Sequence, residues 1–206
     1  MEISESNLTF SFGQEYTAIK FDDKPFYREY FNRMPYSKGV DIIANSDELI
    51  HLLEIKNCKG HEAENRWRTS INNSKLDSAP DTLDVENRDS FDIEVTKKVA
   101  MSILCLFGAW SKTLETEKAL ELEEYWKAID NAKVQKNKKK IVVTLFLEGN
   151  FESVSQTRKK KAIMKRIQES ISQKLSWLNC KACCFMPYTF PLERERRFER
   201  RNFEKS

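Results

Sequence analysis

The chain has 206 residues, of which 40% are hydrophobic and 33% are charged, and its formal net charge is +3. One globular domain with a buried core accounts for this length and composition, whereas a low-complexity chain would need far more than five glycines and five prolines. The longest apolar run, residues 99–110, is too short to cross a bilayer and no secretory leader is visible, so we expect a cytoplasmic protein without membrane contact.

The first half of the chain alternates predicted strands with turns. Three segments rich in apolar residues predict strands, and apolar and polar residues alternate in the first of them. These segments are residues 15–21, 40–44 and 49–56. The polar residues 45–47 separate the last two, which are therefore predicted to form a hairpin. Residues 26–34 are rich in aromatic side chains and fit a short helix or an irregular packed segment, whereas residues 57–90 fit a long polar loop with a short helix around Trp67.

Long helices dominate the second half. Apolar residues at helical spacing predict three helices, at residues 91–110, 113–134 and 153–178. The apolar and β-branched run 141–147 predicts a strand that is buried on both faces, and residues 182–190 predict a last strand.

This order of elements predicts an α/β fold in which a central mixed β-sheet is flanked by α-helices. Residues 1–206 are expected to form a single domain. Within it, the polar residues 1–14 are expected to be loosely ordered, and residues 193–206 to form a surface helix or a flexible tail.

Three residues on the predicted hairpin could do chemistry together. Because side chains alternate along a strand, Glu54 and Lys56 share one face, and Asp41 lies on the neighbouring strand. Two carboxylates, with the backbone carbonyl of Ile55 as a third oxygen ligand, suit a hard divalent cation. A lysine beside such an ion could orient the attacking water or stabilise charge on a phosphate.

Asp41, twelve residues and then Glu54-Ile55-Lys56 resemble the motif of the PD-(D/E)XK nuclease superfamily, which has the restriction-endonuclease-like fold. The resemblance covers residues 38–57 as a motif, with Val40 in place of the usual proline, and extends loosely to the order of elements as far as about residue 187. It implies a nuclease that cleaves phosphodiester bonds, in DNA rather than RNA.

The resemblance also assigns roles to the motif residues. It implies that Asp41 and Glu54 bind Mg²⁺ or Mn²⁺ and that Lys56 supports catalysis. Many members use a further acidic residue from an upstream helix, for which Glu15 and Glu29 are both candidates here.

Positive charge is gathered in the last third of the chain. Residues 133–206 carry 19 Lys and Arg against 7 Asp and Glu, while the rest of the chain is acidic. Nine of these basic residues are candidates for phosphate contacts. They are Lys138, Lys139, Lys140, Arg158, Lys159, Lys160, Lys161, Lys165 and Arg166. The same charges also fit ordinary solvated helix faces.

Two alternatives to a nuclease stay open. A catalytically inactive protein of the same fold could bind nucleic acid or a partner protein through its basic C-terminal half. An interaction protein could also carry the carboxylates and the lysine as ordinary surface residues. If the protein does cut duplexes, a homodimer is expected, because two strands need two active sites or two events.

A zinc site is a separate possibility. Cys58, His61, Cys180 and Cys183 have acceptable spacing within each pair, but cysteines in an apolar strand are often simply small buried residues.

Overall fold

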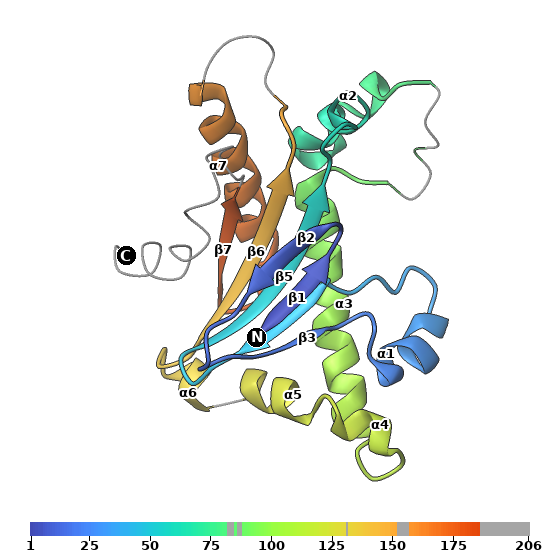
Figure 1. The fold of residues 1–206 in the computed structure, drawn as a ribbon, viewed down its shortest axis with the longest axis vertical. Coiled ribbons are helices and arrows are strands. Elements are labelled where there is room, and N and C mark those ends of the chain that lie inside the picture. The colour runs from blue at the N-terminus through green and yellow to red at the C-terminus, as the bar shows by residue number, and fades with distance from the viewer. Residues whose placement is uncertain (82–84, 86–87, 131, 152–156, 186–206) are drawn as a thin grey trace.

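A five-stranded mixed sheet forms the centre of the computed structural model, which describes residues 1–81, 85, 88–130, 132–151 and 157–185 (Figure 1). The strands lie side by side in chain order: β3 (Thr17–Lys20), β4 (Ile42–Asn45), β5 (Leu49–Asn57), β6 (Lys140–Glu148) and β7 (Cys180–Phe185). Strands β3, β4 and β5 are antiparallel neighbours, whereas β5, β6 and β7 run parallel.

All five predicted strands are therefore confirmed, with shifted ends. The predicted strand 182–190 begins earlier, at Cys180, and its part beyond Phe185 lies outside the described residues, as does the tail 193–206. Strand β6 is buried over most of its length, as its apolar sequence predicts.

Seven α-helices are described. They are α1 (Pro25–Glu29), α2 (Glu62–Asn65), α3 (Phe91–Ser111), α4 (Glu117–Leu120), α5 (Glu123–Ile129), α6 (Ala132–Gln135) and α7 (Thr157–Lys174). The two long ones, α3 and α7, confirm the predicted helices 91–110 and 153–178, although α7 ends earlier than predicted, at Lys174, and residues 153–156 lie outside the described residues.

The single helix predicted for residues 113–134 is wrong, because the segment folds as three short helices. Its buried residues Ala119, Leu122, Tyr125 and Ala128 recur every three positions. A straight α-helix cannot keep such a row on one face, because each step of three falls short of a full turn. The backbone of Asp130 also leaves the helical conformation, with φ −80° and ψ 62°.

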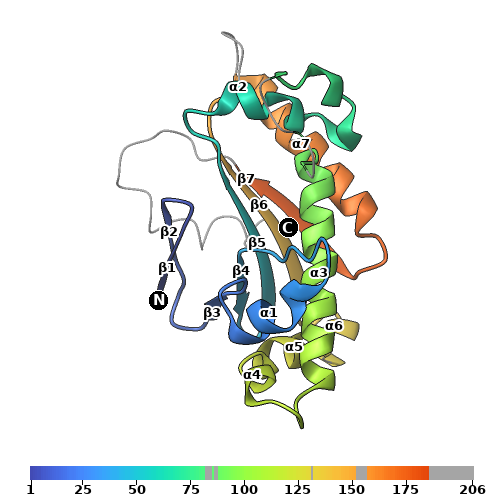
Figure 2. The same cartoon turned by 90° about the vertical axis from the view of Figure 1, so that its right-hand side faces the viewer.

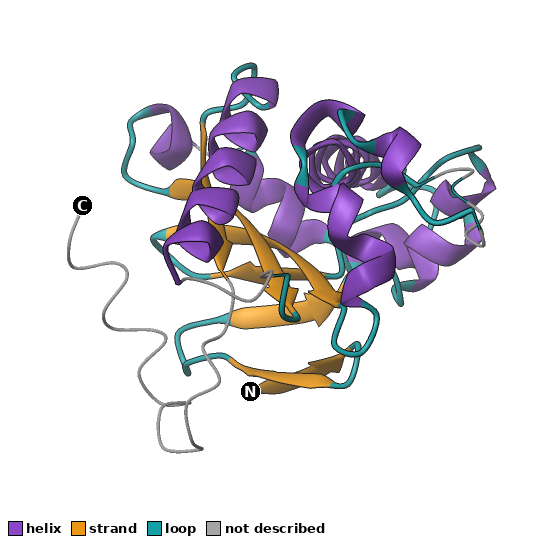
Figure 3. Cartoon of the chain, turned by 90° about the horizontal axis from the view of Figure 1, so that it is seen from above, coloured by secondary structure: helices purple, strands orange, loops and turns teal. Residues whose placement is uncertain are grey.

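The helices contribute to the core on one face of the sheet, and a β-hairpin covers the other (Figures 2 and 3). The hairpin consists of β1 (Glu2–Glu5) and β2 (Leu8–Ser11), joined through Ser6 and Asn7, which both have positive φ. Residues 1–14 are thus not loosely ordered. Phe10 packs edge-on against Phe146 at 5.1 Å between ring centroids, which anchors the hairpin on the sheet.

The hairpin and the helices together bury both faces of β5. Leu53 and Ile55 belong to the core under the hairpin, and Ile50 and Leu52 belong to the core under the helices. Glu54, which alternates with them, must therefore lie on the helix side of the sheet.

The predicted loop 57–90 is partly helical where the structure describes it, with α2 followed by short 3₁₀ turns. Trp67 is buried on one of these turns. Among the described residues, no helix combines the length and the apolar character needed to span a bilayer.

Candidate active site

Asp41 lies immediately before β4, where three strands hold it. Its backbone N–H donates to the carbonyl of Leu53 at 3.1 Å, and its own carbonyl accepts from the N–H of Phe21 at 2.9 Å. Its carboxylate Oδ2 accepts a 2.6 Å hydrogen bond from the backbone N–H of Ile55. The residue is only 9% exposed, so its carboxylate is fixed rather than free to turn.

The segment leading into Asp41 is packed closely against aromatic rings. A Cβ atom on Gly39 would lie 2.8 Å from the ring of Phe21 and 3.0 Å from that of Tyr27, so only glycine fits. The next residue, Val40, donates its N–H to Oγ of Ser102 on α3 at 2.9 Å. These contacts dock α3 against the start of β4, next to Asp41.

Glu54 is fully buried on β5, facing α3. Its Oε1 accepts from the ammonium of Lys98 at 2.6 Å and from that of Lys56 at 2.9 Å. Its Oε2 is buried and has no hydrogen-bond partner among the described residues. A buried carboxylate oxygen without a donor is costly, so this atom marks a position where a ligand would be stabilising.

Lys98 of α3 joins the two carboxylates. Its ammonium lies 2.6 Å from Oε1 of Glu54 and 3.3 Å from Oδ1 of Asp41. The predicted residues Asp41 and Glu54 are therefore brought to one place, where a single cation contacts both. Lys56 lies on the same side, as the alternation of β5 predicts.

A second chain of ion pairs holds Lys56. Its ammonium lies 2.7 Å from Oε1 of Glu94, one turn before Lys98 on α3, and the other oxygen of Glu94 pairs with Arg68. Arg68 is itself anchored, because it donates to the carbonyl of Asp89 at 2.8 Å and lies over the ring of Phe91 at 4.4 Å.

Burial and neighbouring charges shift the pKa values of this cluster. Burial raises the pKa of Glu54 to about 7, despite the opposing effect of the Lys56 ammonium. Burial also opposes charge on Lys56, but the carboxylates of Glu54 and Glu94 outweigh it and hold the pKa of that ammonium above its ordinary range. The pKa of Lys98 is raised in the same way, chiefly by Glu54.

The upstream carboxylate that approaches the site is Asp22, just after β3. Burial raises the pKa of Asp22 and the charge of Asp41 raises it further, and its Oδ1 has no described partner. Neither candidate from the sequence lies there. Glu15 is exposed in a turn, and Glu29 is exposed at the end of α1, where it pairs with Lys118.

The donor set of the site fits a hard divalent cation. Asp41 and Glu54 supply carboxylate oxygens, and one oxygen of Glu54 is unsatisfied. The N–H of Ile55 points to Asp41, and the carbonyl of a strand residue points to the same side as its N–H, so the Ile55 carbonyl is directed there too. No group of three His, Cys, Asp or Glu side chains able to hold a metal is found within the described ranges. Mg²⁺ needs only one or two carboxylates, because it keeps several waters.

Eight of the nine predicted phosphate-binding residues divide into three groups. Lys138, Lys140, Lys161, Lys165 and Arg166 are exposed, Lys160 is half-buried, and the side chains of Arg158 and Lys159 lie outside the described atoms.

The prediction that Lys139 contacts phosphate is wrong, because this residue is buried. Its ammonium donates to Oδ1 of Asn45 at 2.6 Å and to the carbonyl of Ser46. It therefore supports the turn between β4 and β5, and burial lowers its pKa.

The zinc site is not formed. Cys58 follows the end of β5 that pairs with Glu148, whereas Cys180 pairs with Ile141 at the opposite end of β6. Cys180 and Cys183 are three apart on a strand, so their side chains leave opposite faces. All five cysteines are free thiols.

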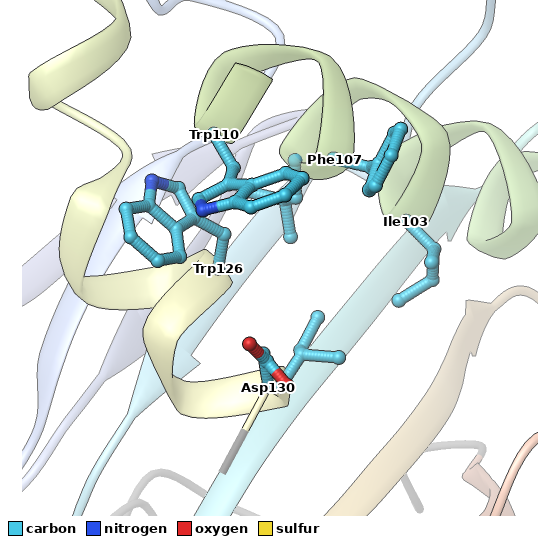
Figure 4. A pocket seen from close by; sticks show the side chains of 7 residues that line it. Ile103, Phe107, Trp110, Trp126 and Asp130 are labelled. Carbon is cyan, nitrogen blue, oxygen red and sulfur yellow. The ribbon is translucent and has the colours of Figure 1, made fainter. Parts of the chain in front are cut away.

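An apolar pocket of about 390 Å³ lies between the second half of α3 and α5 (Figure 4). It is lined by Ile103, Leu106, Phe107, Trp110, Trp126, Ile129 and Asp130. Asp130 is the only titratable side chain among these lining residues, so the pocket lacks the paired groups that the carboxylate cluster has.

The sequence alone does not point to Asp22, Arg68, Glu94 or Lys98. One signal is present for two of them: Glu94 and Lys98 are four residues apart in a helix that is otherwise strongly apolar, and they therefore share one face. A charged stripe on the packed face of a helix indicates partners of opposite charge on the element against which it packs.

Comparison with known proteins gave one match. A family model described as a family of unknown function (DUF6661) matches residues 24–192. No curated protein and no solved structure matches the chain. The matched range includes Asp41, Glu54, Lys56, Glu94 and Lys98.

Proposed function

The chain belongs to the family of unknown function DUF6661, and we propose from the geometry of its site that it is a metal-dependent nuclease that hydrolyses phosphodiester bonds in DNA. The observation that carries the proposal is the convergence of Asp41, Glu54 and Lys56. Both carboxylates contact one ammonium, and Lys56 contacts the same oxygen of Glu54. Such closely spaced buried charges are expensive for stability, which favours a functional reason for them.

The strand topology supports a fold of the PD-(D/E)XK type. Three antiparallel strands, β3 to β5, precede a long helical connection, after which β6 lies parallel to β5. Asp41 lies immediately before the second of these strands and Glu54 and Lys56 lie on the third, as the resemblance of the motif implies. The proposal narrows the α/β architecture to the restriction-endonuclease-like class.

Each residue has a role in this proposal. Asp41, Glu54 and the Ile55 carbonyl would hold Mg²⁺ or Mn²⁺, and the bound ion would neutralise phosphate charge and acidify a water. The Lys56 side chain is 20% exposed, and Glu94 holds its ammonium at 2.7 Å. There it can orient the attacking water or donate to a phosphate oxygen as negative charge develops.

The exposed basic residues are the proposed contacts to the nucleic-acid backbone. Lys161, Lys165 and Arg166 are exposed on α7, and Lys138 and Lys140 are exposed before and at the start of β6. Phosphate contacts of this kind give affinity without sequence specificity. A homodimer remains part of the proposal, to serve both strands of a duplex.

One observation favours a second candidate, a nucleic-acid-binding protein without catalysis. Lys98 already fills the position between Asp41 and Glu54 with a positive charge. If that ammonium is permanent, no metal enters and only the basic surface functions.

A cleavage assay separates the two candidates. Supercoiled plasmid, single-stranded DNA and RNA are each incubated with the protein and with Mg²⁺ or Mn²⁺. We expect metal-dependent DNA cleavage that falls at least about a hundredfold in both Asp41→Ala and Lys56→Ala. The control is Glu15→Ala, which removes an exposed carboxylate outside the cluster. Equal cleavage by wild type and both site variants contradicts the nuclease proposal, and salt-sensitive binding without cleavage favours the second candidate.

A further inference from the structure

Lys98 occupies the place where the proposed metal would bind. Its ammonium contacts Oε1 of Glu54 at 2.6 Å and Oδ1 of Asp41 at 3.3 Å. The side chain is 11% exposed and comes from α3, whereas the carboxylates come from the sheet. The chain thus supplies a cation of its own to the pair of carboxylates.

We propose that Lys98 is an internal counter-cation that a divalent metal ion must displace, so that the site is closed by its own helix until metal binds. The proposal rests on the proposed function, because it concerns the same two carboxylates. It adds a regulatory residue outside the motif.

The charges of the cluster explain why the two cations exclude one another. Asp41, Glu54 and Glu94 are accompanied by Lys56, Lys98 and Arg68, so the ion-paired cluster is close to neutral. A divalent ion bound by Asp41 and Glu54 would lie within contact distance of the Lys98 ammonium. In a buried site of low dielectric, such like-charge contact is strongly unfavourable.

The unsatisfied oxygen of Glu54 indicates that the internal cation does not complete the site. Lys98 and Lys56 both use Oε1, and Oε2 is buried without a described partner. A metal ion would satisfy oxygens that an ammonium at this position leaves unpaired. Exchange of the ammonium for a metal ion therefore satisfies Oε2 of Glu54, while it breaks the ion pairs of Lys98.

The backbone of α3 is held at this point independently of the Lys98 side chain. Ser102 Oγ, one turn along α3, accepts from the N–H of Val40 and donates to the Lys98 carbonyl. Displacement thus needs a rotamer change of one long side chain rather than movement of the helix.

Mn²⁺ binding to Lys98→Met tests the proposal without any measurement of cleavage. Isothermal titration calorimetry with MnCl₂ compares wild type, Lys98→Met and the matched control Lys97→Met. Lys97 is the neighbouring residue on α3, is exposed and pairs with Asp89 outside the cluster. We expect the Mn²⁺ dissociation constant to fall at least about tenfold in Lys98→Met and to stay unchanged in Lys97→Met.

Thermal unfolding gives a second readout of the same exchange. Without metal, Lys98→Met should melt below wild type, because buried Asp41 loses its ion pair and buried Glu54 keeps only the one with Lys56. Mn²⁺ should raise the melting temperature of Lys98→Met more than that of wild type. If Lys98→Met does not fold, Lys98→Gln offers a polar side chain that is one atom shorter than lysine, still carries N–H donors and has no charge.

Chemical footprinting tests the wild-type protein directly. Lysine acetylation, read by mass spectrometry, should increase at Lys98 when Mn²⁺ is added and stay constant at Lys97. Equal Mn²⁺ affinity in wild type and Lys98→Met, or Lys98 reactivity that saturating Mn²⁺ leaves unchanged, overturns the displacement and leaves the proposed nuclease site standing. No Mn²⁺ binding in any variant overturns both.

Discussion

The backbone N–H of Ile55 donates a 2.6 Å hydrogen bond to Oδ2 of Asp41. The middle residue of Glu54-Ile55-Lys56 therefore orients the carboxylate that lies fourteen positions earlier, across the β4–β5 pair. One strand thereby positions all three side chains: it carries Glu54 and Lys56, and its backbone holds Asp41. This contact gives the spacing of the motif a physical reason.

Replacing Asp41 by two neutral residues should separate this hydrogen bond from the charge. Asn keeps an oxygen that can accept from Ile55, whereas Leu leaves that buried N–H unpaired. We expect Asp41→Leu to be less stable than Asp41→Asn by about 1–3 kcal/mol, the usual penalty for a buried unsatisfied donor. Urea unfolding without metal measures the difference, and equal stabilities would mean that the bond does not fix Asp41.

The titrations of buried Glu54 and partly buried His51 should give stability opposite dependences on pH. The pKa of Glu54 is raised by burial to about 7, so its contribution to stability is full below its unfolded value of 4.5 and is lost as the pH rises towards 7. Burial lowers the pKa of His51 to about 4, so its contribution is full above its unfolded value of 6.5 and is lost as the pH falls towards 4.

The two effects oppose one another between pH 4.5 and 6.5. In that window the stability of Glu54→Gln should rise with pH and that of His51→Gln should fall, each by about 1 kcal/mol per pH unit relative to wild type. Urea unfolding at several pH values measures both slopes, with His61→Gln as the control because His61 is exposed. Slopes of the same sign in the two variants would contradict the opposite pKa shifts of Glu54 and His51.

Glu94 should act as a positioning residue through Lys56. Glu94→Gln keeps the size of the side chain but removes the charge that holds the Lys56 ammonium at 2.7 Å. We expect DNA cleavage to fall about tenfold or more, as for a misplaced catalytic group, while Mn²⁺ affinity measured by calorimetry stays near that of wild type. Glu115→Gln serves as the control, since Glu115 pairs with Lys112 on the surface, away from the cluster. A parallel loss of metal binding would place Glu94 among the ligands instead.

Exposed and buried lysines of the basic half should respond differently to substitution. Lys161→Gln and Lys165→Gln should weaken DNA binding and lower the slope of log affinity against log salt by about 0.9 for each phosphate that is no longer neutralised. Lys139→Met should instead lower the free energy of unfolding by about 1–3 kcal/mol, because Asn45 and Ser46 lose a buried donor. Filter binding over a salt series and urea unfolding measure the two effects. If Lys139→Met has the stability of wild type but binds DNA weakly, Lys139 contacts DNA and does not support the β4–β5 turn.

Local patterns predict the elements that carry the motif. Two adjacent apolar stretches with a polar turn between them predict β4 and β5, and the convergence of Asp41 with Glu54 follows from pairing those two strands. The apolar run 141–147 predicts β6, and the helical spacing of residues 91–110 predicts α3. Both predictions succeed because the pattern of apolar residues within each segment marks the side chains that it buries.

Contacts between distant segments could not be predicted in the same way. Lys98 meets Glu54 across 44 positions, and only the packing of α3 on the sheet brings them together. The hairpin of residues 2–11 could not be predicted because its strands are short and polar on one face. Its apolar face is explained only by the sheet residues that it covers, Ile55 and Phe146. Chain order alone points to Glu15 and Glu29, whereas Asp22 approaches Asp41 because β3 ends beside it.

The ion pairs between α3 and the sheet also specify how the helix is seated. Sliding α3 by one turn would bring Glu94 or Ser102 to the position of Lys98. The first would add a third carboxylate to Asp41 and Glu54, and the second would leave Asp41 without a counter-charge and Glu54 with only that of Lys56. Apolar side chains tolerate a shift of one helical turn far better than this arrangement does. Lys98 therefore discriminates against misaligned packings of the longest helix that the structure describes.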